Sequence, residues 1–184
     1  MDLARWMAVA LAFATISTAS AQSTNTRTFD VPGHGGLALA VPEGWRVTTR
    51  SVDNPPSVAL RIDPPSGDAF VLQISSVWLD PSKRAGITSD ELKARTQKSA
   101  EELLPQAIEK QATLVELHGK EANGYYFSLT DRGPATDPKD YKYATQGTLL
   151  VGDLLTVFTF LHRQADDPAK AEALRILGSA RQGP

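Results

Sequence analysis

The side chains best suited to chemistry in this sequence are few and widely spaced. Cysteine is absent, and histidine occurs only at positions 34, 118 and 162. Without cysteine there is no thiolate nucleophile, no disulfide, no zinc–thiolate or iron–sulfur site and no lipoprotein anchor. Any catalytic or metal-binding group must therefore come from histidines, carboxylates, hydroxyls and lysines.

His34 lies in a Gly-His-Gly-Gly loop at residues 33–36. A His-Gly-Gly-Gly loop forms the oxyanion hole of lipases, but it works with a Gly-x-Ser-x-Gly nucleophile elbow. Neither that elbow nor a Ser-x-x-Lys motif is present. We therefore interpret residues 33–36 as a flexible connection between strands.

Glu116 and His118 are two residues apart in a predicted strand, so both point to one face and could share a metal ion. Spacing identifies no third ligand. His162 alternates with Phe158 and Phe160, which indicates a histidine at the rim of the core. We predict no metal site and no cofactor.

The acidic residues of the 131–140 loop are Asp131, Asp137 and Asp140. They lack the spacing and the bidentate glutamate of a calcium loop. The same region holds Arg132, Lys139 and Lys142 beside Tyr141 and Tyr143. Here the carboxylates balance the basic groups, and the whole chain carries a net charge of −2, so we expect no nucleic-acid partner. Phosphate-binding glycine motifs are also absent.

The N-terminus has the pattern of an export signal. Arg5 precedes an apolar run at residues 6–16, and Ala19-Ser20-Ala21 fits the small-x-small pattern of signal peptidase sites. The run is shorter than the roughly 20 residues that span a bilayer. We predict a signal peptide at residues 1–21, Gln22 as the new N-terminus, a periplasmic or secreted location and no stable membrane anchor.

The chain after the signal is predicted to form one domain at residues 28–184, preceded by a flexible N-terminus at residues 22–27. Five β-rich runs, separated by turn residues, fill its first half. We predict strands at residues 28–31, 37–41, 45–52, 57–62 and 69–79. Short turns of this kind join antiparallel neighbours, so the first half is predicted to be an antiparallel meander.

The apolar period becomes helical over residues 88–111. Thr88 and Glu91 fit a capping box at its start. Pro105 removes a backbone donor, so we expect a kink near Leu104 and a short continuation.

Two hairpins and a helix are predicted for the remainder. Residues 141–151 and 154–163 are separated only by Gly152-Asp153, a loop length typical of a primed turn. Residues 113–118 and 121–130 join around Gly119-Lys120, with Asn123-Gly124 as the alternative turn. Asp167 and Pro168 suit the start of a C-terminal helix that docks on the sheet.

The element order, with the segment Val41-Pro42-Glu43-Gly44-Trp45 leaving the second strand, resembles the Mog1/PsbP-like family over residues 29–181. The resemblance implies an α+β fold in which an antiparallel β-sheet is sandwiched by helices. It also implies a non-enzymatic accessory or binding role. Independently of the family, Trp45 enters a strand with a large apolar side chain, and we expect it to be buried in the core.

We expect an exported, non-enzymatic accessory or binding protein of the cell envelope that contacts a protein, a peptide or an apolar ligand there. The alternatives are a carrier of lipid or another hydrophobic ligand, and an envelope enzyme built around Glu116, His118 and His162. The hairpin at residues 149–161 is apolar on both faces, which predicts a covered central position. Partner contacts are therefore expected in loops, at Trp78, Arg84 and Tyr141, unless Trp78 is buried beneath the first helix.

Overall fold

The computed structural model describes residues 24–65, 70–134, 137 and 140–184. The predicted signal peptide, residues 1–21, lies outside the described residues. None of the helices in these ranges is long and apolar enough to cross a membrane.

Strands dominate the described chain. They are β1 (Thr24–Asp30), β2 (Gly36–Pro42), β3 (Arg46–Asp53), β4 (Pro56–Asp63), β5 (Phe70–Trp78), β6 (Val115–His118), β7 (Ala122–Thr130), β8 (Tyr143–Val151), β9 (Leu154–His162) and β10 (Arg181–Gly183). The helices are α1 (Pro81–Ala85), α2 (Ser89–Leu103), the 3₁₀ turn η1 (Leu104–Gln106) and α3 (Pro168–Gly178).

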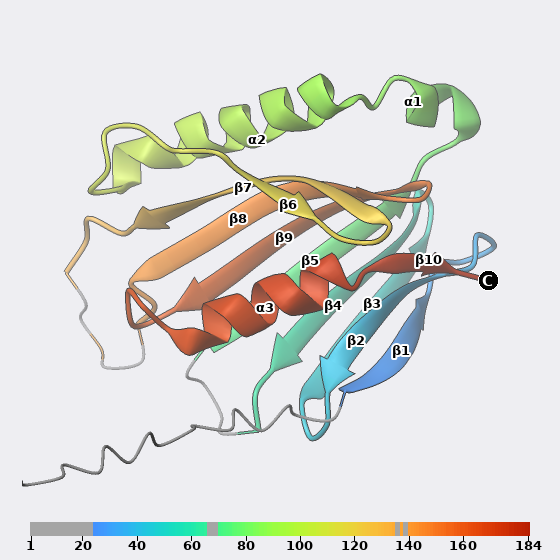
Figure 1. Ribbon diagram of the computed structural model, residues 1–184, viewed down its shortest axis with the longest axis horizontal. Helices are drawn as coiled ribbons and strands as arrows, with labels where there is room; N and C mark the ends of the chain where they lie inside the picture. Colours follow the sequence, from blue (N-terminus) through green and yellow to red (C-terminus); the bar gives the residue numbers. More distant parts are fainter. Residues whose placement is uncertain (1–23, 66–69, 135–136, 138–139) are drawn as a thin grey trace, which may run out of the picture.

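The strands form two antiparallel sheets. The larger has the order β3-β4-β5-β9-β8-β7-β6, and the smaller has the order β1-β2-β10. Figure 1 shows α2 on one side of the large sheet, and α3 with the small sheet on the other. The predicted α+β fold with an antiparallel sheet between helices is confirmed, and the small sheet is an addition that we did not predict.

The core lies mainly between the large sheet and the layer formed by α3 and the small sheet. Its buried members include Leu39 from β2, Leu72 from β5, Phe158 from β9 and Ile176 from α3. A second, smaller cluster around Ala100 and Phe127 lies between α2 and the sheet. Because the cluster under α2 is the smaller one, the helix buries three residues: Leu92, Thr96 and Ala100.

Trp45 is part of the main core, as expected. Its side chain is 8% exposed, and its ring lies 5.1 Å from that of Phe70. Gly44 precedes it with φ +80°, a conformation that glycine adopts without strain. The Pro-Glu-Gly turn thus directs the indole inward.

Local signals explain the helix boundaries. The Thr88 hydroxyl accepts a hydrogen bond from the Glu91 N–H at 3.2 Å, which caps α2 as predicted. The α-helix ends at Leu103, and the 3₁₀ turn containing Pro105 takes the place of the expected continuation to residue 111. Asp167 caps α3 by accepting from the Ala169 N–H at 2.9 Å.

Both predicted hairpins are present. β8 and β9 pair from Tyr143↔His162 to Val151↔Leu154, with Gly152 at φ +58° in the two-residue turn. β6 and β7 turn at Gly119-Lys120, where the Gly119 N–H donates to the Ala122 carbonyl at 2.6 Å. The alternative turn at Asn123-Gly124 is wrong, because both residues lie inside β7.

One prediction about the end of a segment is wrong, and two further elements were not predicted. The flexible N-terminus at residues 22–27 is wrong from Thr24 onward, because β1 begins there and pairs with Pro42. The connection after Trp78 contains the short helix α1, capped by Asp80. Residues 181–183 form β10, which pairs with β2. Three residues are too few for a periodic pattern to predict a long-range pairing of this kind.

One face of the large sheet is only partly covered. α2 contacts β7 and β8, but the outward residues of β3, β4, β5 and β9 extend beyond it. Val157, on this face of β9, is 39% exposed. The prediction that both faces of the 149–161 hairpin are covered is therefore wrong at β9, although the hairpin is central in the strand order.

Candidate functional site

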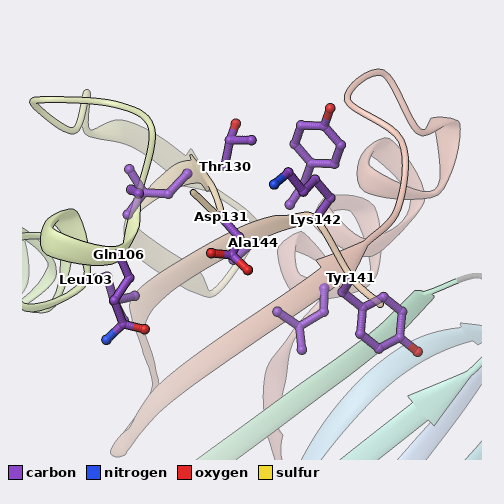
Figure 2. Close-up of a pocket in the computed structure, with 11 residues that line it drawn as sticks. Leu103, Gln106, Thr130, Asp131, Tyr141, Lys142 and Ala144 are labelled. Atoms are coloured by element: carbon purple, nitrogen blue, oxygen red, sulfur yellow. The ribbon is translucent and has the colours of Figure 1, made fainter. Parts of the chain in front are cut away.

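A hollow at the C-terminal end of α2 contains Tyr141, one of the three residues predicted to contact a partner. Its volume is about 200 Å³. Figure 2 shows Leu103 and Gln106 on one side of it and Tyr141 on the other. The lining residues are Leu103, Gln106, Ala107, Leu129, Thr130, Asp131, Tyr141, Lys142, Tyr143, Ala144 and Leu161.

Five elements meet at this hollow, which we call the Tyr141 pocket. α2 and η1 supply one wall, the end of β7 and the start of β8 supply the floor, and Leu161 comes from β9. Leu129 and Ala107 are buried, whereas Tyr141 and Leu161 are half-buried. The side chains facing the hollow are thus apolar in its depth and more polar at its rim.

Backbone hydrogen bonds hold the rim of the Tyr141 pocket in place. The Arg132 N–H donates to the Gln106 carbonyl at 2.8 Å, and the Asp131 N–H donates to the Lys142 carbonyl at 2.9 Å. The Arg132 guanidinium also donates to the Ala107 carbonyl at 2.8 Å. These contacts tie η1 to the loop that precedes Tyr141, so the pocket is preformed.

Glu109 also holds the end of β7, which forms part of the pocket floor. Its carboxylate accepts from the Thr130 N–H and from the Thr130 hydroxyl, both at 2.8 Å. Partial burial disfavours the charged carboxylate, but the two hydrogen bonds from Thr130 outweigh it, so the pKa of Glu109 lies below its ordinary value. Glu109 is therefore an anionic clamp at neutral pH.

The polar groups at the rim are already engaged. The Lys142 ammonium donates to the Gly133 carbonyl, and the Asp131 carboxylate accepts from the Gly133 N–H at 2.9 Å. The Arg163 guanidinium lies 5.4 Å from the centre of the Tyr141 ring. Hydrophobic contact is consequently the main interaction that the pocket offers a ligand.

Trp78 and Arg84 lie at the opposite end of the large sheet. Tyr141 lies just before β8, and Gly152, which Arg84 contacts, lies just after it. Because β8 has nine residues, the two ends of this strand are about 30 Å apart. Trp78 is half-buried and stacks on His34 at 3.6 Å with an interplanar angle of 14°. The alternative position of Trp78 beneath the first helix is wrong, because the covering group is His34 from the β1–β2 turn.

Arg84 joins α1 to the β8–β9 turn. Its Nε donates to the Gly152 carbonyl at 2.8 Å and lies 3.8 Å from an Asp153 carboxylate oxygen. Gln182 of β10 accepts from the Asp153 N–H at 2.7 Å and donates to the His34 carbonyl at 3.4 Å. Gln182 could not be identified from its residue type or spacing, because only long-range pairing brings β10 to this turn.

Glu116 and His118 form the expected pair on one face of β6, with 2.7 Å between His118 Nε2 and Glu116 Oε2. The hydrogen bond to Glu116 raises the pKa of the exposed His118, and the same bond lowers the pKa of Glu116. Tyr125 also donates to Glu116 at 3.2 Å. Among the described residues, no group of three acidic, histidine or cysteine side chains is placed to hold a metal ion.

His162 belongs to the core. It is 2% exposed, lies against the rings of Phe160 and Tyr143, and has Nδ1 2.6 Å from the Gln164 carbonyl oxygen. Burial lowers its pKa. His118 pairs with Asn123 at the start of β7, whereas His162 pairs with Tyr143 at the far end of β8. The three residues of the enzyme alternative therefore do not form one site.

Comparisons with protein-family profiles and with curated proteins give no match. Among solved structures, the chain is similar to cyanobacterial PsbP (CyanoP) from Synechocystis sp. PCC 6803. The TM-score is 0.48 at 14% identity, and the match covers 92% of this chain and 98% of that chain. This similarity is to a PsbP-like fold, the family that the element order and residues 41–45 resemble.

Proposed function

We propose that this chain is an exported, non-catalytic binding protein that recognises an apolar side chain of a partner protein or peptide through the Tyr141 pocket. The preformed, apolar Tyr141 pocket is the single observation that carries this proposal. Its walls come from α2, η1, β7, β8 and β9, and its rim is fixed by hydrogen bonds. A pocket of this kind binds without first being ordered, which lowers the entropic cost of association.

The size of the pocket argues for a side chain over a whole lipid. An apolar cavity of about 150 Å³ takes a benzene molecule, and sites for larger organic ligands have about 300–1,000 Å³. The hollow of about 200 Å³ matches a branched aliphatic or aromatic side chain. A carrier of lipid is therefore the less favoured function.

Trp78 and Arg84 have a supporting role in this proposal. Trp78 packs on His34, and Arg84 binds the β8–β9 turn, so both stabilise the far end of the sheet. Of the three residues predicted for partner contact, Tyr141 is the one that lines the proposed site.

The pocket can be tested with a small probe that imitates a side chain. We would titrate the ¹⁵N,¹³C-labelled chain with N-acetyl-leucinamide and follow the methyl signals of Leu103, Ala107, Leu129 and Leu161. Saturable shifts at these methyls are expected, with much smaller shifts from N-acetyl-glycinamide.

Ala144→Phe places a ring in the pocket and should abolish the shifts. Ala85→Phe adds the same ring at an exposed position of α1 and should leave them unchanged. Shifts spread over the surface, or shifts that survive Ala144→Phe, would contradict the proposed site.

Export is tested separately. Mass spectrometry of the chain recovered from the cell envelope or the medium should give Gln22 as the N-terminus. Recovery of exported protein that retains Met1 or Asp2 would refute cleavage after Ala21.

A further inference from the structure

The uncovered face of β3, β4, β5 and β9 carries a second hollow. The strand register aligns one row of exposed side chains across these four strands: Arg50, Ala59, Ser75 and Val157. The neighbouring row contains Thr48, Arg61 and Gln73, all exposed. Between the rows lies a concavity of about 340 Å³ that shares no lining residue with the Tyr141 pocket.

The charged side chains that line this concavity all carry positive charge. Both charged residues that line it are arginines, and its other polar residues, Thr48, Thr49, Gln73 and Ser75, can donate hydrogen bonds as well as accept them. Carboxylates do not contribute to the lining among the described residues. The surface is therefore complementary to a ligand with negative charge and hydrogen-bond acceptors.

The two arginines differ in how they are held. Arg61 binds Asp63 through two contacts, Nε to Oδ2 at 3.1 Å and Nη2 to Oδ1 at 2.9 Å. The Asp63 side chain is 5% exposed and fixes the guanidinium beside the concavity. Arg50 is exposed, and in the described part of the chain none of the ion pairs or hydrogen bonds involves its side chain. Arg50 can thus pair with a ligand without first breaking an internal contact.

We propose that this face, which we call the Arg50 face, binds an acidic segment of a partner protein. The donors are spread over three adjacent strands, a width of about 10 Å, which suits an extended segment better than a single ion. Ala59 and the exposed Val157 lie in the same row as Arg50 and offer apolar contact to the aliphatic parts of such a segment. A nucleic acid fits less well, because none of the described residues that line the concavity is an aromatic on which a base could stack.

The test uses a hexaglutamate peptide and a ¹⁵N-labelled sample of the chain. Backbone amide shifts are expected at residues 48, 50, 59, 73, 75 and 157, and hexalysine should produce none there. Arg50→Glu should weaken the hexaglutamate Kd by about tenfold, since it removes one exposed charge pair and adds a repulsion. Lys120→Glu makes the same change of charge in the exposed β6–β7 turn and should alter the Kd less than twofold.

Equal weakening by Arg50→Glu and Lys120→Glu, or shifts centred elsewhere, would overturn the proposal. Sedimentation equilibrium without peptide should give a monomer. A dimer that Arg50→Glu dissociates would assign the face to a second copy of this chain and would also overturn it. Preferential binding of a six-nucleotide oligo-dT over hexaglutamate would assign the face to nucleic acid instead. Ala144→Phe blocks the Tyr141 pocket and should leave hexaglutamate binding unchanged. The two proposed sites can therefore be refuted independently of each other.

Discussion

Replacement of Trp45 by alanine tests how far the core depends on the turn that precedes β3. The indole is 8% exposed and packs against Phe70, with 5.1 Å between ring centres and an interplanar angle of 50°. Phe70 in turn lies 5.2 Å from Phe160 of the neighbouring strand β9. The substitution therefore removes one end of a line of three aromatic rings that joins the turn before β3 to β5 and β9.

The expected loss follows from the volume removed. Truncating a buried tryptophan to alanine costs about 3–5 kcal/mol, because the apolar transfer energy is lost and the cavity closes only in part. For a domain of this size, each kcal/mol lowers the melting temperature by about 2–4 °C. Trp45→Ala should therefore lower the melting temperature by about 6–20 °C.

Far-UV circular dichroism measures this change without relying on tryptophan fluorescence. Trp78→Ala is the matched control, because Trp78 is only half-buried, where it stacks on His34 and packs against the edge of the main core. Its effect should be less than half that of Trp45→Ala. A Trp45→Ala protein that melts within about two degrees of wild type would refute the assignment of this residue to the core.

Three further results are expected. Gly147→Ala should destabilise the fold by about 1–3 kcal/mol, because the new Cβ would lie 2.4 Å from the Tyr125 carbonyl oxygen. Gly86→Ala is the control and should be tolerated, because its Cβ would lie 3.5 Å from the nearest atom. Equal urea midpoints for the two variants would contradict this. Burial lowers the pKa of His162 below 6.5, so the unfolded chain binds a proton that the folded chain does not, and the free energy of unfolding should fall as pH falls below 6.5 towards the folded pKa. The loss between pH 7 and pH 5 should be smaller in His162→Phe, and identical losses would refute the attribution. Excess EDTA should leave the melting temperature unchanged, and a lowered value would reveal a structural metal.

The sequence predicted the elements whose signals are local. Gly152-Asp153 between two β-rich runs fixed the turn of the β8–β9 hairpin, and Thr88 with Asp167 located the starts of two helices. These signals act over a few residues, so they remain valid whatever the rest of the chain does.

The features that the sequence missed depend on contacts between distant segments. β10 is a strand because Arg181 and Gln182 pair with Ala38 and Leu37 of β2, and no periodicity in three residues reports this. The exposure of Val157 depends on where α2 lies over the sheet, which its own amphipathic pattern does not specify.

The candidate site was predicted only in part. Tyr141 stood out as an aromatic in a loop, but its pocket also needs η1, the end of β7 and Leu161 of β9. These residues come from five elements, so the hollow can be recognised only when the order of the strands in the sheet is known. The Arg50 face could not be predicted from the sequence for the same reason, because Arg50 and Ala59 become neighbours only through the strand register.

The central claim is that the Tyr141 pocket receives a side chain of a partner protein in the compartment where the chain acts. The most direct measurement is photocrosslinking in living cells with p-benzoylphenylalanine at position 141. We predict a crosslink to one protein that is lost when Ala144→Phe fills the pocket, and no such crosslink from the same probe at Lys98, an exposed position on α2. A crosslink that persists with Ala144→Phe, a crosslink to lipid alone, or none above the Lys98 control would contradict the account.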